Sequence, residues 1–354
     1  MDLLVLAVAF VVILIGAELF TNGIEWFGRH LNLAEGAVGS VLAAVGTALP
    51  ETMIPIIAIL FATGESSHGV GVGAILGAPF MLSTLAMFVT GSAVLIMARR
   101  RAQGDRMLID PHVLGMDVRY FMVAYGLAIG AAFLPLDPDW PKWLVALVLL
   151  GMYAYYVKRH FDTEAGDGSH DDELAPLRMH RLDRSPSRMG EGTPRLRIVN
   201  VQVVFALGCI IAGAIIFVGA VERLAASIGI DEILLALVIA PIATELPEKL
   251  NSVIWVRAGK DTLAMGNITG AMVFQSTIPT VVALLFASDA WSVGEGSQVA
   301  FASAGIALIS TAVIFFPMMR RGYLRGRGLL VGGMFYLAYL AIVGYTILNT
   351  PAGG

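Results

Sequence analysis

Charged residues are scarce in this sequence, which excludes an ordinary soluble protein. Only 14% of the 354 residues are Asp, Glu, Lys or Arg, against about 25% in a typical soluble domain. Hydrophobic residues make up 57% of the chain, and the mean hydropathy is +0.78. The composition predicts a protein that lies in a lipid bilayer. The net charge of −4 says little about partners in such a protein, and we predict inorganic cations and membrane lipids, with no nucleic acid.

Several kinds of functional residue are also missing. Cysteine occurs once, at Cys209, so no internal disulfide can form. No hydrophobic span holds a histidine pair, a His-Glu-x-x-His pattern or a serine–histidine constellation, which disfavours a membrane-embedded hydrolase. No nucleotide-binding motif is evident, so active transport would have to draw its energy from an ion gradient. We therefore predict that the protein is not an enzyme and carries no cofactor.

Long hydrophobic runs are abundant and predict the fold class. A helix needs about 20 apolar residues to cross a bilayer, and ten runs come near that length. They lie at 2–24, 33–62, 70–98, 118–135, 140–157, 198–221, 232–256, 262–287, 297–317 and 328–348. The sequence thus predicts an all-α polytopic membrane protein with about ten transmembrane helices.

Basic residues predict the orientation of these spans. The loops after odd-numbered spans hold 20 of the 23 Lys and Arg residues, whereas the loops after even-numbered spans are mainly acidic. Because cytoplasmic loops carry the basic excess, we predict a cytoplasmic central loop and both termini outside. Asp2 stands where a signal peptide would carry positive charge, so we expect the first span to be retained. The expected location is the plasma (inner) membrane.

The two halves of the chain resemble each other. At an offset of 197 residues, Gly46-Thr-Ala-Leu-Pro-Glu51 aligns with Ala243-Thr-Glu-Leu-Pro-Glu248. Each half holds five spans, an odd number, so the second half must cross the membrane in the opposite sense to the first. The predicted architecture is two inverted five-helix repeats, at 1–157 and 198–354, joined by a polar cytoplasmic linker at 158–197.

The predicted linker is rich in charge, glycine and proline and cannot bury a core. Its histidines, His160, His170 and His180, lie among acidic residues, which leaves a metal sensor as an alternative. Because their spacing matches no metal-ligand pattern, we expect them to be solvated.

Each repeated motif places a proline and a glutamate inside a hydrophobic run. A charged side chain at the centre of a bilayer costs about 2.5 kcal/mol or more, so Glu51 and Glu248 are candidate functional groups. A proline within a helix leaves the carbonyl four residues earlier without its donor. The released carbonyls would be those of Gly46 and Ala243, and in a membrane they must face protein, water or an ion.

Together the two motifs supply oxygen ligands for a cation. Thr47 and Thr244 place a hydroxyl beside each released carbonyl. Carboxylate, carbonyl and hydroxyl oxygens form the ligand set that Ca²⁺ prefers, and two carboxylates neutralise one divalent ion. We predict a central cation site with Glu51 and Glu248 as metal ligands. The alternative is a proline kink in which each glutamate is protonated, hydrogen-bonded and important only for packing.

These motifs resemble those of the cation/calcium exchanger superfamily. Its sodium/calcium exchangers carry a Thr-Ser-x-Pro-Glu type motif in each half, followed by a glycine-rich helix. Here the glycine-rich segments are Gly71-Val-Gly73-Ala-Ile-Leu-Gly77-Ala78 and Gly266-Asn-Ile-Thr-Gly270-Ala271. The resemblance implies the inverted five-plus-five bundle of that family. It also implies cation ligands at Thr47, Glu51, Thr244 and Glu248.

The sequence departs from the family pattern at several ligand positions. Ala48 and Glu245 stand where the family has serine after the threonine. On the glycine-rich helices, Leu82 and Gln275 stand where the family has Asn or Asp. We retain Gln275 as a candidate cation ligand, while the transported ion and the sodium coupling stay open.

Glu245 allows two interpretations. It could be a third carboxylate and metal ligand of the site, where its closeness to Glu248 would favour a proton that exchanges for metal. It could instead pair with Lys249, four residues later on the same helix. The first interpretation makes proton coupling a rival to sodium coupling.

From these observations we predict a secondary active cation antiporter. It would export Ca²⁺ in exchange for Na⁺ or H⁺, by alternating access to a central site containing Glu51 and Glu248. The alternatives are an antiporter for another cation, a passive cation channel or a membrane-embedded hydrolase. Glu18, on the first span, either lines an access path or reaches the membrane interface.

Overall fold

The computed structural model describes residues 2–30, 48–61, 67–164, 176–180, 194–228, 252–253, 255–257, 259, 261–294 and 297–349. In this part of the chain, helices account for all regular structure apart from two three-residue strands. The elements are α1 (Asp2–His30), α4 (Leu49–Leu60), α5 (Ser67–Met81), the π-helix η2 (Leu82–Ala86), α6 (Met87–Met97), β1 (Arg106–Leu108), α7 (Pro111–Ala131), α8 (Trp140–Glu164), α9 (Leu196–Ile228), α11 (Asp261–Phe286), α12 (Gln298–Arg321), β2 (Tyr323–Arg325), α13 (Gly326–Leu329) and α14 (Val331–Asn349).

Eight of the described helical segments are long and apolar enough to cross a membrane. They confirm the predicted all-helical, polytopic class. The predicted second span overlaps the shorter helix α4 but lies half outside the described residues, and the seventh, at 232–256, lies almost wholly outside them. The count of ten spans therefore stays a prediction.

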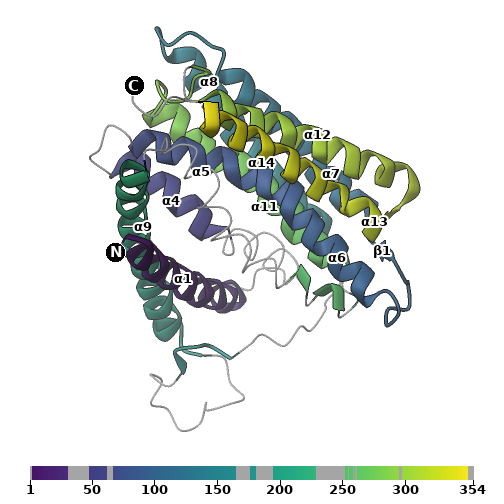
Figure 1. The fold of residues 1–354 in the computed structure, drawn as a ribbon. Helices are drawn as coiled ribbons and strands as arrows, with labels where there is room; N and C mark the ends of the chain where they lie inside the picture. Colours follow the sequence, from purple (N-terminus) through teal and green to yellow (C-terminus); the bar gives the residue numbers. More distant parts are fainter. Residues whose placement is uncertain are drawn as a thin grey trace.

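The helices form a bundle with a separate pair at its side (Figure 1). The bundle contains α5 to α8, α11, α12 and α14, and the pair is α1 with α9. Within the protein, 83% of Ala264–Phe286 in α11 is buried but only 22% of Trp140–His160 in α8. Helix α11 is therefore the central helix, and α8 lies at the periphery. Helix α4 lies between the pair and the bundle, since it packs against α5, α9 and α11.

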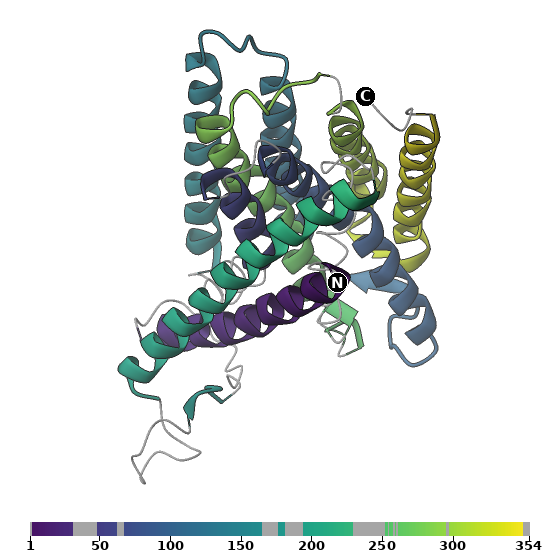
Figure 2. The same cartoon turned by 60° about the vertical axis from the view of Figure 1, so that its left-hand side comes forward.

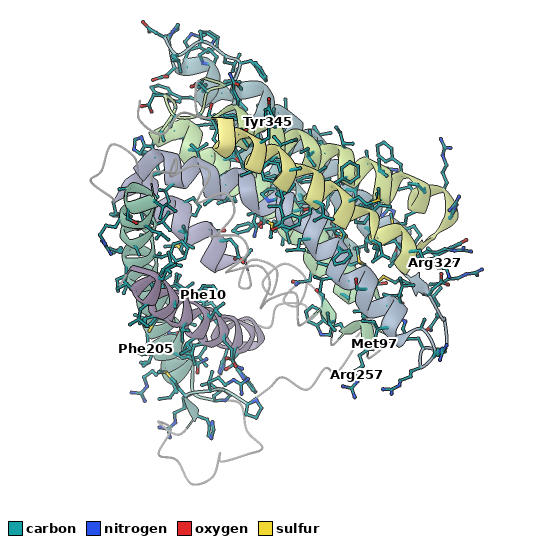
Figure 3. The ribbon with its side chains drawn as sticks, viewed as in Figure 1. Phe10, Met97, Phe205, Arg257, Arg327 and Tyr345 are labelled. Atoms are coloured by element: carbon teal, nitrogen blue, oxygen red, sulfur yellow. The ribbon has the colours of Figure 1, made fainter. Side chains whose placement is uncertain are left out.

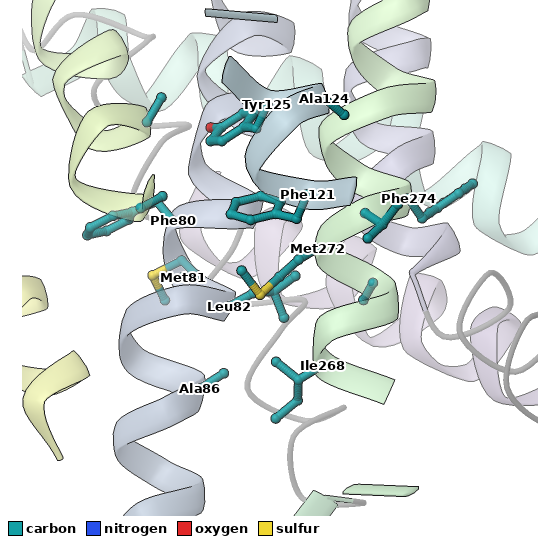
Figure 4. Close-up of a cluster of buried hydrophobic side chains, with 14 of the residues drawn as sticks. Phe80, Met81, Leu82, Ala86, Phe121, Ala124, Tyr125, Ile268, Met272 and Phe274 are labelled. Atoms are coloured by element: carbon teal, nitrogen blue, oxygen red, sulfur yellow. The ribbon is translucent and has the colours of Figure 1, made fainter. Parts of the chain in front are cut away.

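Two hydrophobic clusters hold these parts together. The larger one joins α5, η2, α7 and α11, and Figure 4 shows Leu82, Phe121 and Met272 close together in it. The smaller cluster joins α1, α4, α5 and α9 and includes Ile13, Ile54, Val70 and Phe217. Burial of this apolar surface by α4 connects the α1–α9 pair to the bundle.

Helices α1 and α9 run antiparallel, side by side (Figure 2). A Cβ atom on Gly16 would lie 2.9 Å from Ile210 Cγ1, and one on Gly213 would lie 2.6 Å from Ile13 Cγ1. Glycine at these two positions thus permits the close approach of the backbones. The contacts are reciprocal: Gly16 and Ile13 correspond to Gly213 and Ile210 at the offset of 197 residues. This is the pattern expected of equivalent helices related by a two-fold axis.

Loops from distant parts of the sequence meet at one end of the bundle (Figure 3 labels Met97, Arg257 and Arg327 there). Strand β1 pairs antiparallel with β2, which puts Arg106 opposite Arg325. The buried Arg101 guanidinium donates to both carboxylate oxygens of Asp261, at 2.7 and 2.6 Å. We call this end, at which α8 stops and α9 starts, the linker end.

The opposite end is held by a lysine and a tryptophan. The Lys142 ammonium, on the first turn of α8, donates to the carbonyl of Trp291 at 3.0 Å and to that of Ser288. The Trp291 indole N–H donates to the carbonyl of Ala128 at 2.9 Å. These bonds fasten the connection between α11 and α12 to α7 and α8.

The first residues of the predicted linker, 158–164, are helical. Helix α8 continues through Glu164, seven residues beyond the end of the hydrophobic run. As a result His160 is 4% exposed, and the expectation that it is solvated is wrong. His180 bonds to the carbonyl of Leu177, and His170 lies outside the described residues.

Candidate cation site

Glu51 lies in the first turn of α4 and is 4% exposed. The helix begins at Leu49, so Pro50 occupies its second position, where the missing N–H costs no helical hydrogen bond. The positive end of the helix dipole at this turn stabilises a carboxylate. Glu51 thus belongs to the helix that packs both against α9 of the pair and against α5 and α11 of the bundle.

Gln275 lies on α11 and is 1% exposed. In the described part of the chain, neither its amide nitrogen nor its amide oxygen has a hydrogen-bond partner. A buried polar group left in this state costs about 1–3 kcal/mol, and it calls for an unseen water, ion or functional role. Since α11 packs against α4, the helices that carry Gln275 and Glu51 are neighbours.

The hydroxyls next to Gln275 behave differently, because their own helix satisfies them. Ser276 and Thr277 donate to the carbonyl of Val273, at 3.1 and 2.7 Å. Residues 193 positions earlier repeat the arrangement: Ser83 and Thr84 donate to the carbonyl of Phe80, at 3.0 and 2.6 Å. The repeat is thus visible in side-chain geometry as well as in sequence, and within this turn of α11 Gln275 is the polar side chain without a hydrogen-bond partner in the described part of the chain.

A proline follows each of the two candidate residues by four positions. Pro55 lies inside α4, four residues after Glu51, and Pro279 lies inside α11, four residues after Gln275. Proline has no N–H, so the carbonyls of Glu51 and Gln275 lack their regular helical donors. Each residue therefore offers a side-chain oxygen and a released backbone carbonyl. Sequence reasoning missed these prolines, although a proline four residues after a polar residue in a span was a usable signal.

Replacement of Pro279 by alanine is expected to weaken Ca²⁺ binding about tenfold, the equivalent of about 1.4 kcal/mol. The new N–H would close the helical hydrogen bond to the Gln275 carbonyl and remove that oxygen from the site. Calorimetric titration of the detergent-solubilised protein with Ca²⁺ measures this. Pro317→Ala in α12 is the matched control, because Pro317 and Val313, four residues earlier, are both on the exposed surface. Equal affinities of the native protein and Pro279→Ala would exclude the role of this carbonyl.

Six of the predicted site residues lie outside the described residues: Gly46, Thr47, Ala243, Thr244, Glu245 and Glu248. Glu51 and Gln275 are the two that the structure places. Within the described ranges there is no group of three or more His, Cys, Asp or Glu side chains that could hold a metal ion. Glu18 is exposed and pairs with Arg178 at 2.9 Å, so it reaches the surface, as the second of its two interpretations expected.

Fold and site define a class: an all-helical, multi-pass membrane protein with a buried carboxylate, Glu51, on the helix that lies between two groups of helices. The sequence matches the family model described as "Sodium/calcium exchanger protein" over residues 1–159 and 199–348. The chain belongs to this sodium/calcium exchanger family. It is a transporter and not an enzyme.

Individual proteins agree with this assignment. The chain is 25% identical over 346 residues to a protein of Alkalimonas amylolytica named "Putative antiporter CaxA", with 96% of each chain covered. The crystal structure of the H⁺/Ca²⁺ exchanger CAX matches with a TM-score of 0.70 at 18% identity, over 98% of this chain and 84% of that one. A structure of the sodium–calcium exchanger NCX_Mj, soaked with Na⁺ and Sr²⁺, matches with a TM-score of 0.59 at 16% identity, over 96% and 99%. These two structures share the fold of the chain.

Proposed function

We propose that the protein is a secondary active antiporter that exports Ca²⁺ in exchange for H⁺ across the plasma (inner) membrane. The observation that carries the proposal is the buried carboxylate of Glu51, on α4, the helix that packs against both α9 and α11. A carboxylate in a membrane span is costly and marks an ion pathway by default. It can hold either a proton or part of the charge of Ca²⁺, so the two ions compete for it, and competition at one site couples their movements.

Protons are favoured over sodium as the counter-ion, because several side-chain oxygens of the exchanger pattern are missing from this sequence. Ala48 and Leu82 have no side-chain oxygen where the exchanger pattern supplies one, and Gln275 is neutral. Sodium would need those oxygens, whereas a proton needs only a carboxylate.

The full proposed site combines both repeats. Glu51 and Gln275 would be joined by Glu248, with Glu245 as a third metal ligand or proton carrier. The hydroxyls of Thr47 and Thr244 and the carbonyls of Gly46 and Ala243 would complete an oxygen shell of the kind that Ca²⁺ takes. The six residues from the undescribed parts of the chain enter this proposal from the sequence pattern.

Alternating access would come from movement of the α1–α9 pair against the bundle. The pair contacts the bundle mainly through α4, the helix that carries Glu51, while α1 and α9 pack closely on each other. The reciprocal glycine contacts support two inverted five-helix repeats, 1–157 and 198–354, with the linker on the cytoplasmic side. Movement of the pair toward either end would then open the same site to either side of the membrane.

Reconstituted protein gives the direct test. Proteoliposomes loaded at acid pH, with Ca²⁺ outside, are expected to accumulate Ca²⁺ only while the outward proton gradient lasts. An outward Na⁺ gradient at equal pH should drive none. Ca²⁺ uptake under the Na⁺ gradient would identify Na⁺, not H⁺, as the counter-ion. Uptake without any gradient would indicate a channel, and no uptake under either gradient would indicate that another cation is transported.

A further inference from the structure

Asp117 is a second carboxylate inside a candidate membrane span, and the cation site described above does not use it. It lies on α7, seven residues into the segment Pro111–Ala131, and is 1% exposed. Tyr156 and His160, both on α8, bond to its Oδ1 atom at 2.9 and 3.0 Å. The Thr269 hydroxyl, on α11, donates to its Oδ2 atom at 2.6 Å. Three helices therefore meet at this one side chain.

The hydrogen bonds match an ionised carboxylate. Tyrosine and threonine hydroxyls can each donate, and the Nε2 atom of His160 can donate from the neutral imidazole as well as from the charged one. Such charge-assisted bonds are about twice as strong as those between neutral groups. A carboxylate that accepts three of them compensates the cost of its burial and becomes a rigid junction.

Thr269 shows that the junction holds α11 in particular. A buried threonine in a helix usually donates to its own backbone, as Thr90 does to the Ala86 carbonyl at 2.8 Å. The Thr269 hydroxyl has such an acceptor too, the Met265 carbonyl at 3.1 Å. It has one proton, and the shorter, charge-assisted contact of 2.6 Å directs that proton to Asp117. Helix α11 is thereby bonded to α7.

A second anchor holds the same half of α11. Asp261, the first residue of the helix, accepts from Arg101 and also from the backbone N–H of Leu108 at 3.0 Å. Asp261 and Thr269 are eight residues apart, or about 12 Å along the axis. The two anchors lie at different points along the axis of α11 and bind different parts of the protein. Together they fix both the rotation of α11 and its position along its axis.

We propose that Asp117 is a positioning residue for the cation site. Through Thr269 it sets the orientation of α11, and so the position of Gln275, six residues or about 9 Å further along the helix. The inference rests on the proposed function, because it takes Gln275 to be a cation ligand. It adds a polar network of α7, α8 and α11 that supports that ligand from the linker end.

The test compares Asp117→Asn and Thr269→Val with Thr269→Ser, which keeps the hydroxyl. Thr90→Val is the matched control, because its hydroxyl is equally buried and bonds within its own helix. Proteoliposome uptake gives the apparent KM for Ca²⁺ and the maximal rate, and thermal unfolding reports stability. Hydrogen–deuterium exchange of the 262–280 segment reports the order of α11 independently of any transport.

Asp117→Asn and Thr269→Val are expected to raise the KM about tenfold, since each weakens or removes a hydrogen bond to a charged group. Both should speed amide exchange in 262–280, while Thr269→Ser and Thr90→Val stay within about twofold of the native KM. If the variants unfold at a lower temperature but keep the native KM and the native amide exchange in 262–280, Asp117 serves stability alone and the proposal is overturned. If the native protein moves no Ca²⁺, the proposed function fails, and unchanged exchange in 262–280 would then refute the positioning role separately.

Discussion

Substitution of Glu51 by glutamine is expected to abolish Ca²⁺ exchange while the protein remains folded. Glutamine keeps the size of the side chain but loses the charge that binds Ca²⁺ and the group that carries a proton. Truncation of one partner of a buried charged interaction costs about 2–5 kcal/mol. This corresponds to a loss of at least about 30-fold in affinity, and loss of the proton carrier should remove the remaining coupled uptake. Flux of ⁴⁵Ca into acid-loaded proteoliposomes measures the effect.

Glu18→Gln provides the matched control, because Glu18 is an exposed glutamate on α1 that pairs with Arg178. Exposed pairs contribute little, about 0–1 kcal/mol, so this variant should transport normally. Thermal unfolding of Glu51→Gln checks that the variant is folded under the conditions of the transport assay. Normal exchange by folded Glu51→Gln would remove Glu51 from the site and leave the proposed mechanism without its central group.

Valine at Gly16 or Gly213 is expected to separate α1 from α9, destabilise the protein and stop transport. At Gly16 the new Cβ would lie 2.9 Å from Ile210 Cγ1 and 3.0 Å from the Ala206 carbonyl oxygen, and the backbone atom cannot move aside as a side chain can. Overpacking of this kind costs about 1–3 kcal/mol. Thermal unfolding in detergent should show a lower midpoint for both variants, and uptake assays should show loss of exchange.

Gly208 on α9 is the control, since no atom would lie within 4 Å of a Cβ placed there. Gly208→Val should unfold and transport as the native protein does. Ile210→Ala should partly restore Gly16→Val, because it removes the nearest clashing side chain. Equal damage from Gly208→Val would mean that β-branching in the helix, rather than the close contact of α1 and α9, causes the defect.

The sequence predicted the parts of the fold that depend on local signals. Hydrophobic runs located the helices, and the motif repeat directed attention to Glu51, which the structure buries. The Asp117 network was missed because its members, at 117, 160 and 269, share no period or motif and meet only when three helices pack. His160 was assigned to the linker because the hydrophobic run ends at 157, whereas the helix continues to Glu164 on residues that are more polar.

Only part of the candidate site was predicted, because the rest depends on how the helices pack. Gln275 was identified from its place in the glycine-rich repeat, but its unsatisfied amide is a property of packing that no sequence pattern reports. Pro55 and Pro279 were readable from the sequence. Their meaning depends on which carbonyls are buried, and that becomes clear only when α4 and α11 are placed inside the protein.

The π-helix η2 distinguishes the two halves at equivalent positions. Residues Leu82–Ala86 are wound with one extra residue in the turn, while their counterparts at the offset of 193, Gln275–Pro279, continue as a regular α-helix. We predict that, besides the movement of the α1–α9 pair, the two halves exchange this difference in winding when the site opens to the other side. A structure of the opposite state should then show 275–279 as a π-helix and 82–86 as an α-helix. Pro279 favours that change, because it has no N–H whose α-helical bond would have to break. Transport would in this way become an exchange of helical winding between the two halves, with Gln275 at the first residue of the turn that changes.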